Sequence, residues 1–311
     1  GSADRRIQVI LQENAGQAAA LNAAFNASRG EILCFLDSDD LWATEKLRNV
    51  VDAFAASPSS GFAIHKLARV DGSGSQSLGE IPLVYALPTG WLGAQAPVDA
   101  PWVPRGIPPC SALSLRRVVA DRIFPLPMGL RAFADTPIQV LAPLLTPILA
   151  LDQPLGAYRI HGQNAGAVRS FTDVHLRRLV DFDRELWHIW RGFLASSSCK
   201  HPIPSKPPVT QNRYVYARFR REPETGRVYR AFVAGPHFRG LPALYRAFWK
   251  ASSWLPDWAF RQAFELVQGQ RSTKLVLAGA LQRLRRFKDV THVFHRPDKR
   301  VCSKTRKPVG D

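Results

Sequence analysis

The segment E-I-L-C-F-L-D-S-D-D at residues 31–40 decides the fold of this chain. Residues 31–36 form a continuous apolar run of strand length, which is the pattern of a strand buried on both faces. The run ends in three carboxylates within four residues. In open α/β sheets, ligands bind at the carboxyl ends of the strands. The segment therefore predicts a buried strand that carries an acidic turn to a ligand site.

The segments around this run predict alternating helices and strands. Residues 6–11 are a short β-rich run that predicts a strand, and residues 15–28 are dense in alanine and stop at Gly30, as a helix does. After the acidic turn, residues 44–56 alternate apolar and polar side chains at helical spacing. This order is typical of an open α/β sheet. Three later segments predict a strand leading into a helix, a further strand and a long helix: residues 111–122, 149–158 and 174–194.

A proline-rich stretch and a change of charge divide the chain. Residues 199–209 contain four prolines in eleven residues, which indicates a linker. We therefore predict one domain over residues 1–198 and a second region over residues 199–311. From residue 200 onward there are 24 Lys and Arg against 7 Asp and Glu, whereas residues 1–199 hold 18 of each. The net charge of +17 therefore belongs to the second region alone.

The basic region calls for an acidic partner, either an anionic membrane surface or nucleic acid. Residues 245–266 and 274–288 combine basic side chains with tryptophans or a leucine stripe, which suits helices in the interfacial layer of a membrane. Solvated helices packed on the main domain are the alternative, and the pattern leaves both open. No RRM, KH or zinc-finger pattern occurs, so no specific nucleic-acid partner is predicted. We expect residues 240–311 to contact an anionic membrane surface.

The cysteines and the apolar stretches bear on localisation. Four cysteines are widely separated without a C-x-x-C pair, which is typical of a reduced, cytoplasmic protein. The most apolar stretch, residues 137–151, is short and broken by prolines, so it does not predict a membrane-spanning helix. We expect a cytoplasmic protein, peripheral on the inner face of the cell membrane.

The acidic turn at residues 37–40 has two interpretations. Three neighbouring carboxylates repel one another, so such a turn is costly unless a cation holds it. Carboxylate oxygens with open water positions suit Mn²⁺ or Mg²⁺ bridging a diphosphate. Alternatively, the turn is only an Asp-rich cap for the helix that follows it. Its spacing does not match a calcium loop, which needs a glycine at position six and a glutamate at position twelve.

Four short motifs occur in one unbroken order near the start of the chain, and two more lie far downstream. They are E-N-A-G-Q (residues 13–17), L-N-A (21–23), R-G-E (29–31), F-L-D-S-D-D-L-W (35–42), L-R-A-F-A-D (130–135) and L-D-Q-P-L-G-A-Y-R-I-H-G-Q-N (151–164). This series, over roughly residues 5–165, resembles the family 2 inverting glycosyltransferases of the GT-A fold. The resemblance implies a Rossmann-like open sheet of the α/β class, followed here by a basic, mainly helical C-terminal region.

The resemblance also implies a reaction. A sugar would pass from a nucleotide diphosphate-sugar donor to a hydroxyl of a glycan or a lipid-linked acceptor, with inversion, in the presence of Mn²⁺ or Mg²⁺. No Q-x-x-R-W motif of the processive synthases is present, so transfer of a single sugar is expected rather than polymerisation. The alternative is a catalytically incomplete fragment or pseudoenzyme that binds a membrane or a partner.

Individual roles follow from the resemblance, residue by residue. Asp39 and His161 would hold the metal ion, and Asp37 would contact the nucleotide ribose or the water shell of the metal. Asp135 would be the general base that deprotonates the acceptor hydroxyl. Without the motifs, a lone histidine or aspartate would be a hydrogen-bonded loop residue or a helix cap. Four further residues are expected to contact the nucleotide-sugar donor: Asn14, Gly16, Asn22 and Arg159.

The start of the chain departs from the family pattern. In the family, a strand, a helix and a second strand ending in an acidic D-D-G-S turn precede the E-N-x-G segment and hold the nucleotide base. Such an arm needs about 30 residues or more, and only twelve residues precede Glu13. We therefore expect the base-binding half of the donor site to lie outside this chain.

Overall fold

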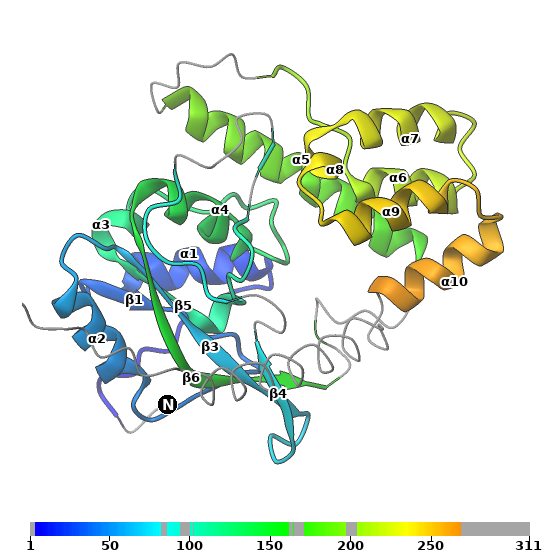
Figure 1. The fold of residues 1–311 in the computed structure, drawn as a ribbon. Coiled ribbons are helices and arrows are strands. Elements are labelled where there is room, and N and C mark those ends of the chain that lie inside the picture. Colours follow the sequence, from blue (N-terminus) through cyan, green and yellow to red (C-terminus); the bar gives the residue numbers. More distant parts are fainter. Residues whose placement is uncertain are drawn as a thin grey trace, which may run out of the picture.

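The computed structural model describes residues 4–81, 86–93, 100–101, 103–161, 164, 171–196 and 204–268. In these residues a mixed sheet flanked by helices precedes a second, helical region (Figure 1). The strands are β1 (Ile32–Cys34), β2 (Leu41–Trp42), β3 (Phe62–Asp71), β4 (Ser77–Ile81), β5 (Leu113–Arg116) and β6 (Ile148–Ile160). The helices of the first part are α1 (Gln17–Ala27), α2 (Lys46–Ala56), α3 (Arg117–Ala120), α4 (Thr136–Leu145) and α5 (Asp173–Ser196), with a 3₁₀ turn η2 (Cys110–Ala112).

The order of the strands brings the acidic turn beside the end of β6. The sheet runs β1-β5-β3-β6-β2, and β4 pairs with β3 off this path. β3 and β6 are parallel, whereas the other pairs are antiparallel. β2 directly follows the acidic turn and pairs with β6 through Leu41 and Ala157. At Gly156 a Cβ atom would lie 2.7 Å from the Leu41 carbonyl oxygen, so glycine permits this close pairing.

Both faces of the sheet are covered by helices. Because alternate residues of a strand point to opposite faces, Phe62 and Ile64 of β3 pack into the main core, while Ala63 packs against Val50 and Phe54 of α2. The main core also contains side chains of α1, α4 and the second half of α5. The α/β class is therefore confirmed, with a helical layer on each side of the sheet.

The second region is built around aromatic side chains. Its helices are α6 (Gln211–Phe219), α7 (Thr225–Ala234), α8 (Pro236–Arg239), α9 (Ala243–Ser252) and α10 (Asp257–Gln268). Tyr214, Phe232, Trp249 and Phe260 are fully buried at its centre. The helical nature predicted for this region is therefore confirmed.

Helix α5 joins the two cores. Its first half places Leu176 in the aromatic core of the second region, and its second half places Trp187 and Trp190 in the core beside the sheet. The predicted division after residue 198 lies just beyond this shared helix. One continuous helix therefore contributes side chains to both cores.

Most elements lie where the sequence predicted them. The helices predicted over residues 15–28, 44–56 and 174–194 are α1, α2 and α5. The passage from strand to helix at residues 111–122 is β5 followed by α3, and residues 149–158 lie within β6. No helix in the described part of the chain is long and apolar enough to cross a membrane. The stretch 274–288 lies outside the described residues.

One strand prediction was wrong, and a second was correct only in part. Residues 6–11 form no strand, and Ile7 and Leu11 are 59% and 91% exposed. An extended run becomes a strand only where a neighbour accepts its hydrogen bonds, and no strand of the described residues pairs with it. The strand expected to be buried on both faces, residues 31–36, is the three-residue β1 at one edge of the sheet. Its residues are only partly buried because it has a neighbour on one side alone.

Candidate active site

A cleft of about 670 Å³ lies beside the acidic turn that follows β1. Five separate parts of the chain line it: the start of α1, the acidic turn, the segment just before η2, the segment that leads into and begins α4, and the end of β6 with Asn164. The structure brings four of the predicted site residues to this cleft, namely Asp37, Asp39, Asp135 and His161. Carboxylates and an imidazole on the walls of one cleft can bind a cation and a phosphorylated ligand with it.

Asp40 fastens the acidic turn to the rest of the sheet. It is only 5% exposed, and one carboxylate oxygen accepts a hydrogen bond from Ser111 Oγ at 2.6 Å. The other accepts the Arg159 backbone N–H at 3.1 Å. Ser111 Oγ in turn accepts the backbone N–H of Asp37 at 3.0 Å. Burial raises the pKa of Asp40 to about 6.

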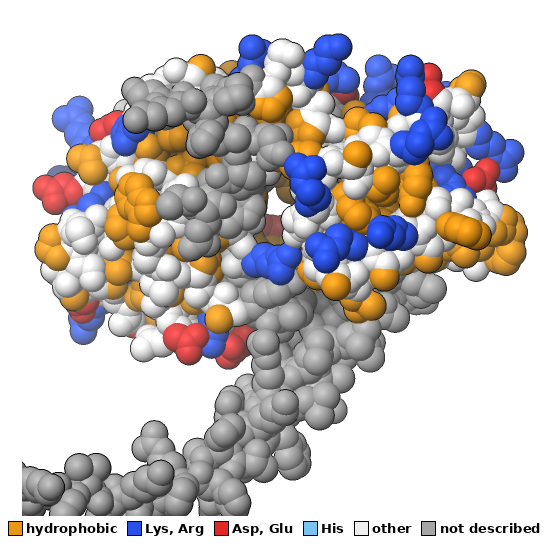
Figure 2. Space-filling view, turned by 45° about the horizontal axis from the view of Figure 1, so that its top comes forward, with side chains coloured by type: hydrophobic (Ala, Val, Ile, Leu, Met, Phe, Trp, Pro, Cys, Tyr) orange, Lys and Arg blue, Asp and Glu red, His pale blue; other side chains and the backbone are white. Residues whose placement is uncertain are grey.

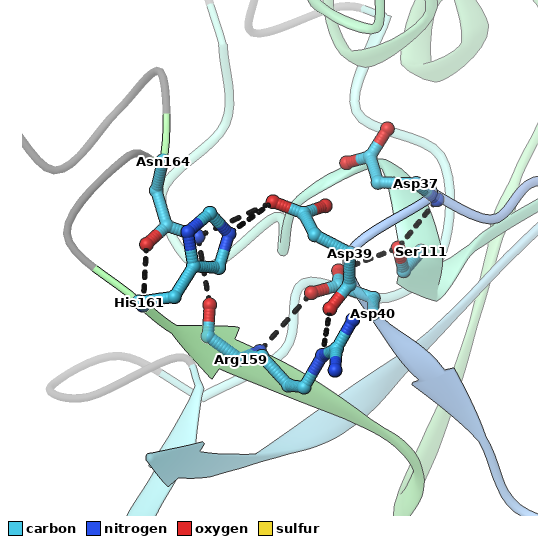
Figure 3. Close-up of polar contacts among 7 residues, drawn as sticks. All are labelled: Asp37, Asp39, Asp40, Ser111, Arg159, His161 and Asn164. Atoms are coloured by element: carbon cyan, nitrogen blue, oxygen red, sulfur yellow. Dashed lines mark hydrogen bonds and ion pairs between the residues drawn. The ribbon is translucent and has the colours of Figure 1, made fainter. Parts of the chain in front are cut away.

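The three carboxylates of the turn point in different directions (Figure 3). That of Asp39 points toward the end of β6. One oxygen of Asp39 lies 2.8 Å from Nε2 of His161 and 3.4 Å from Nδ2 of Asn164. Asn164 also accepts the backbone N–H of His161 at 3.0 Å. The guanidinium of Arg159 donates to the backbone carbonyl of Asp39. Arg159 therefore holds the turn from behind and does not line the cleft.

The pair of Asp39 and His161 is the best candidate for a metal site. Among the residues that the structure describes, no three His, Cys, Asp or Glu side chains are grouped so as to hold one ion. Two protein ligands, one oxygen and one nitrogen, leave further coordination positions to a ligand and water. This donor set fits Mn²⁺ or Mg²⁺, which commonly use few protein ligands together with substrate phosphates.

Gln17 links the acidic turn to the segment that carries Asp135. Its Nε2 donates to Asp37 at 3.1 Å, and its Oε1 accepts the Ala134 backbone N–H at 2.9 Å. Burial, with the nearby charges of Asp135 and Asp39, raises the pKa of Asp37 to about 6. The carboxylates of the cleft therefore lie close enough to affect one another.

Asp135 stands at the first position before α4, yet its side chain makes no capping hydrogen bond. One of its oxygens instead accepts the Cys110 backbone N–H at 3.0 Å and Gln139 Nε2 at 3.2 Å. Burial raises the pKa of Asp135. The carboxylate is therefore oriented at the cleft by two donors rather than used to start the helix.

Asn22 does not line the cleft. It is buried, and its amide nitrogen donates to the Leu126 carbonyl at 2.8 Å. Its amide oxygen accepts the Leu126 backbone N–H at 2.7 Å. Both ends of the amide are therefore used to fix the chain at Leu126, and Asn22 has a structural role in this fold.

Asn14 and Gly16 shape the start of α1 beside the cleft. Asn14 Oδ1 accepts the Gly16 backbone N–H at 3.1 Å. Gly16 has φ +92°, and a Cβ atom there would lie 2.6 Å from Cα of Arg131. The chain carrying Arg131 can therefore approach closely enough to accept the Gln17 backbone N–H at 3.0 Å.

Two residues that the sequence analysis did not single out hold the site together. Lys46 is fully buried, and its Nζ donates to the Ser111 carbonyl at 2.7 Å and to the Phe35 carbonyl at 3.5 Å. Desolvation lowers the pKa of Lys46 to about 8. The sequence signal for its burial was its spacing, because Lys46, Val50 and Phe54 recur every four residues and form the buried face of α2. Ser111 carried no comparable local signal.

Replacing Lys46 with methionine is expected to lower the free energy of unfolding by roughly 1–3 kcal/mol, because two buried carbonyls lose their donor. Urea denaturation followed by circular dichroism measures this. The exposed Arg48 on the same helix is the control, and Arg48→Met should change stability by less than about 0.5 kcal/mol. Wild-type stability of Lys46→Met would show that Lys46 does not support the turn.

Part of the chain is similar to known proteins. Residues 2–119 match the family model for glycosyl transferase family 2. The uncharacterised glycosyltransferase alr2836 of a Nostoc species is 35% identical over 171 residues, which cover 51% of this chain and 48% of that protein. The putative teichuronic acid biosynthesis glycosyltransferase TuaG of Bacillus subtilis is 44% identical over 50 residues, 16% of this chain and 20% of that protein. The chain thus spans about half the length of the first of these relatives.

A solved structure, TarS residues 1–349 of S. aureus, covers 72% of this chain and 65% of its own, with a TM-score of 0.34 and 16% identity.

Proposed function

We propose that this chain, whose residues 2–119 match the family model for glycosyl transferase family 2, transfers a sugar from a nucleotide diphosphate-sugar to a hydroxyl group. The supporting observation is that Asp37, Asp39, Asp135 and His161, from distant parts of the chain, face one cleft of about 670 Å³. The relative TuaG is described as a putative teichuronic acid biosynthesis enzyme, which supports a glycan or lipid-linked polysaccharide precursor as the acceptor.

The donor diphosphate would lie against the end of β6. There the carboxylate of Asp39 and Nε2 of His161 would hold Mn²⁺ or Mg²⁺, and the bound ion would offset the negative charge of the leaving diphosphate. Asn164 and Arg159 keep Asp39 in place through its side chain and its backbone carbonyl. Asp37, which also lines the cleft, would contact the ribose or the water shell of the ion.

Asp135 would act as the general base in a single inverting displacement. The acceptor oxygen attacks the anomeric carbon while the bond from that carbon to the diphosphate oxygen breaks, and the acceptor proton passes to Asp135. The Cys110 N–H and Gln139 orient the carboxylate for this step. Burial, which raises the pKa of Asp135, makes it a stronger proton acceptor than an exposed aspartate.

Donor binding tests the proposal. A panel of nucleoside diphosphates and their sugars is expected to raise the melting temperature in the presence of Mn²⁺, because a ligand that binds only the folded chain stabilises it. A fitting donor should also release its nucleoside diphosphate. The alternative function, a non-catalytic domain that binds a membrane or a partner, predicts neither effect for any member of the panel.

A further inference from the structure

Two tryptophans are largely exposed to solvent where α9 leads into α10, Trp254 in the connecting turn and Trp258 at the start of α10. Trp254 is 89% exposed and Trp258 is 67% exposed. Other tryptophans of the chain are well buried, since Trp187 and Trp190 in the core beside the sheet and Trp249 in the aromatic core are at most 1% exposed. The fold therefore has room for tryptophan in its cores but leaves these two outside. Large apolar side chains exposed together usually mark a binding surface.

The turn that carries these indoles is held rigidly from behind. The guanidinium of Arg218, only 10% exposed, donates to the Ser252 carbonyl at 2.6 Å and to the Leu255 carbonyl. It also lies 3.4 Å from the carboxylate of Asp257. A fixed turn loses little conformational entropy when its side chains bind. The exposed indoles are therefore presented by an ordered surface rather than by a loose loop.

Basic side chains surround the turn. Lys250 lies one helical turn before Trp254, Arg261 lies three residues after Trp258, and both are exposed. Arg221, with a side chain 78% exposed, lies 3.2 Å from Asp257. Residues 204–268 contain 11 Lys and Arg against 4 Asp and Glu. Figure 2 shows Lys and Arg side chains gathered over the helical region, with hydrophobic side chains at its outer edge.

We propose that the α9–α10 turn, through Trp254 and Trp258, is the point at which this protein contacts an anionic lipid surface. Indoles are favoured at the membrane–water interface, and exposed Lys and Arg are attracted to anionic headgroups. The turn forms the outer corner of the helical region, away from the sheet (Figure 1). A projecting corner can insert between headgroups without a complementary surface, whereas a stable protein interface of about 800 Å² per partner needs one. The contact does not depend on the transfer reaction, although it would hold the cleft near a lipid-linked acceptor.

Vesicle co-sedimentation of the full chain tests this inference without any sugar donor. The wild type should bind phosphatidylcholine vesicles that contain phosphatidylglycerol and should release as salt rises from about 0.1 M to about 1 M, which shortens the Debye length from about 10 Å to about 3 Å. The double variant Trp254→Ser, Trp258→Ser should bind about 10- to 100-fold more weakly. Its melting temperature should stay that of the wild type, because both indoles are exposed.

Matched variants in the sheet domain provide the controls. Trp91 is also exposed, at 53%, and Trp91→Ser should bind vesicles as the wild type does. Lys250→Glu should weaken binding, whereas Arg48→Glu, the same change in charge on exposed α2, should leave it nearly unchanged.

Three outcomes would overturn the inference. The first is no binding of the wild type to anionic vesicles at low salt. The second is equal binding to vesicles of phosphatidylcholine alone. The third is wild-type binding by the tryptophan double variant, which would place the contact elsewhere in the chain.

Discussion

Replacing Asp135 with asparagine is expected to lower turnover of a sugar donor and acceptor by about two to four orders of magnitude, while donor binding stays nearly intact. Asparagine keeps an oxygen that can accept the Cys110 N–H, so the segment before α4 should hold its shape. It cannot accept the proton of the acceptor hydroxyl. The loss should therefore appear in kcat rather than in the affinity for the donor.

The pH profile of kcat separates a base from a merely structural carboxylate. Because burial raises the pKa of Asp135, its ionised form is lost at a higher pH than that of an exposed aspartate. Turnover should therefore fall as the pH decreases through that raised pKa, and the fall should be absent from the residual activity of Asp135→Asn.

An exposed aspartate on α2 provides the control for Asp135→Asn. Asp52 is exposed on α2, and Asp52→Asn should have wild-type kinetics. If Asp135→Asn retained more than about a tenth of wild-type turnover, another group in the cleft would have to be the base.

The segment around the acidic turn could be predicted because its signals are local. The apolar run before residue 37, the carboxylates after it and the helical spacing of residues 44–56 all lie within one short stretch. The elements β1 and α2 lie in that stretch, although β1 is shorter than predicted. The cleft could not be predicted from local signals, because Asp135 and His161 are far from the turn in the sequence and reach it only when the chain folds. Matching motifs, rather than spacing, brought them into the prediction.

What the sequence could not provide was the set of long-range contacts. Asn22 matches a donor-site motif, yet its amide is used by the Leu126 backbone, 104 residues away. Nothing near Asn22 in the sequence indicates that partner. Ser111 is a single serine after a proline-rich stretch, and its hydroxyl becomes important only when folding places it between Asp37 and Asp40. The run at residues 6–11 has strand composition, but pairing depends on a neighbour that composition does not reveal.

Binding of Mn²⁺ at the acidic turn is expected to have a large effect on thermal stability. Mn²⁺ is expected to raise the melting temperature of the wild type and to have little effect on Asp39→Ala, because Asp39 and His161 supply the candidate ligands. Differential scanning fluorimetry at increasing Mn²⁺ measures both. Asp152 offers the control, because its side chain is 83% exposed and does not line the cleft, and Asp152→Ala should respond as the wild type does.

The size of the metal response should depend on pH in a definite direction. In the folded chain the pKa of Asp37 is raised from 3.8 to about 6, and that of Asp40 likewise. The protonated carboxyl is therefore favoured by folding, and its contribution to stability is present below pH 3.8 and lost as the pH rises through about 6. Above that pH the turn holds uncompensated negative charge, which a divalent cation offsets. The stabilisation by Mn²⁺ should thus be much larger near pH 7.5 than near pH 5. An equal response at both pH values, or an equal response in Asp39→Ala, would place any metal binding outside the acidic turn.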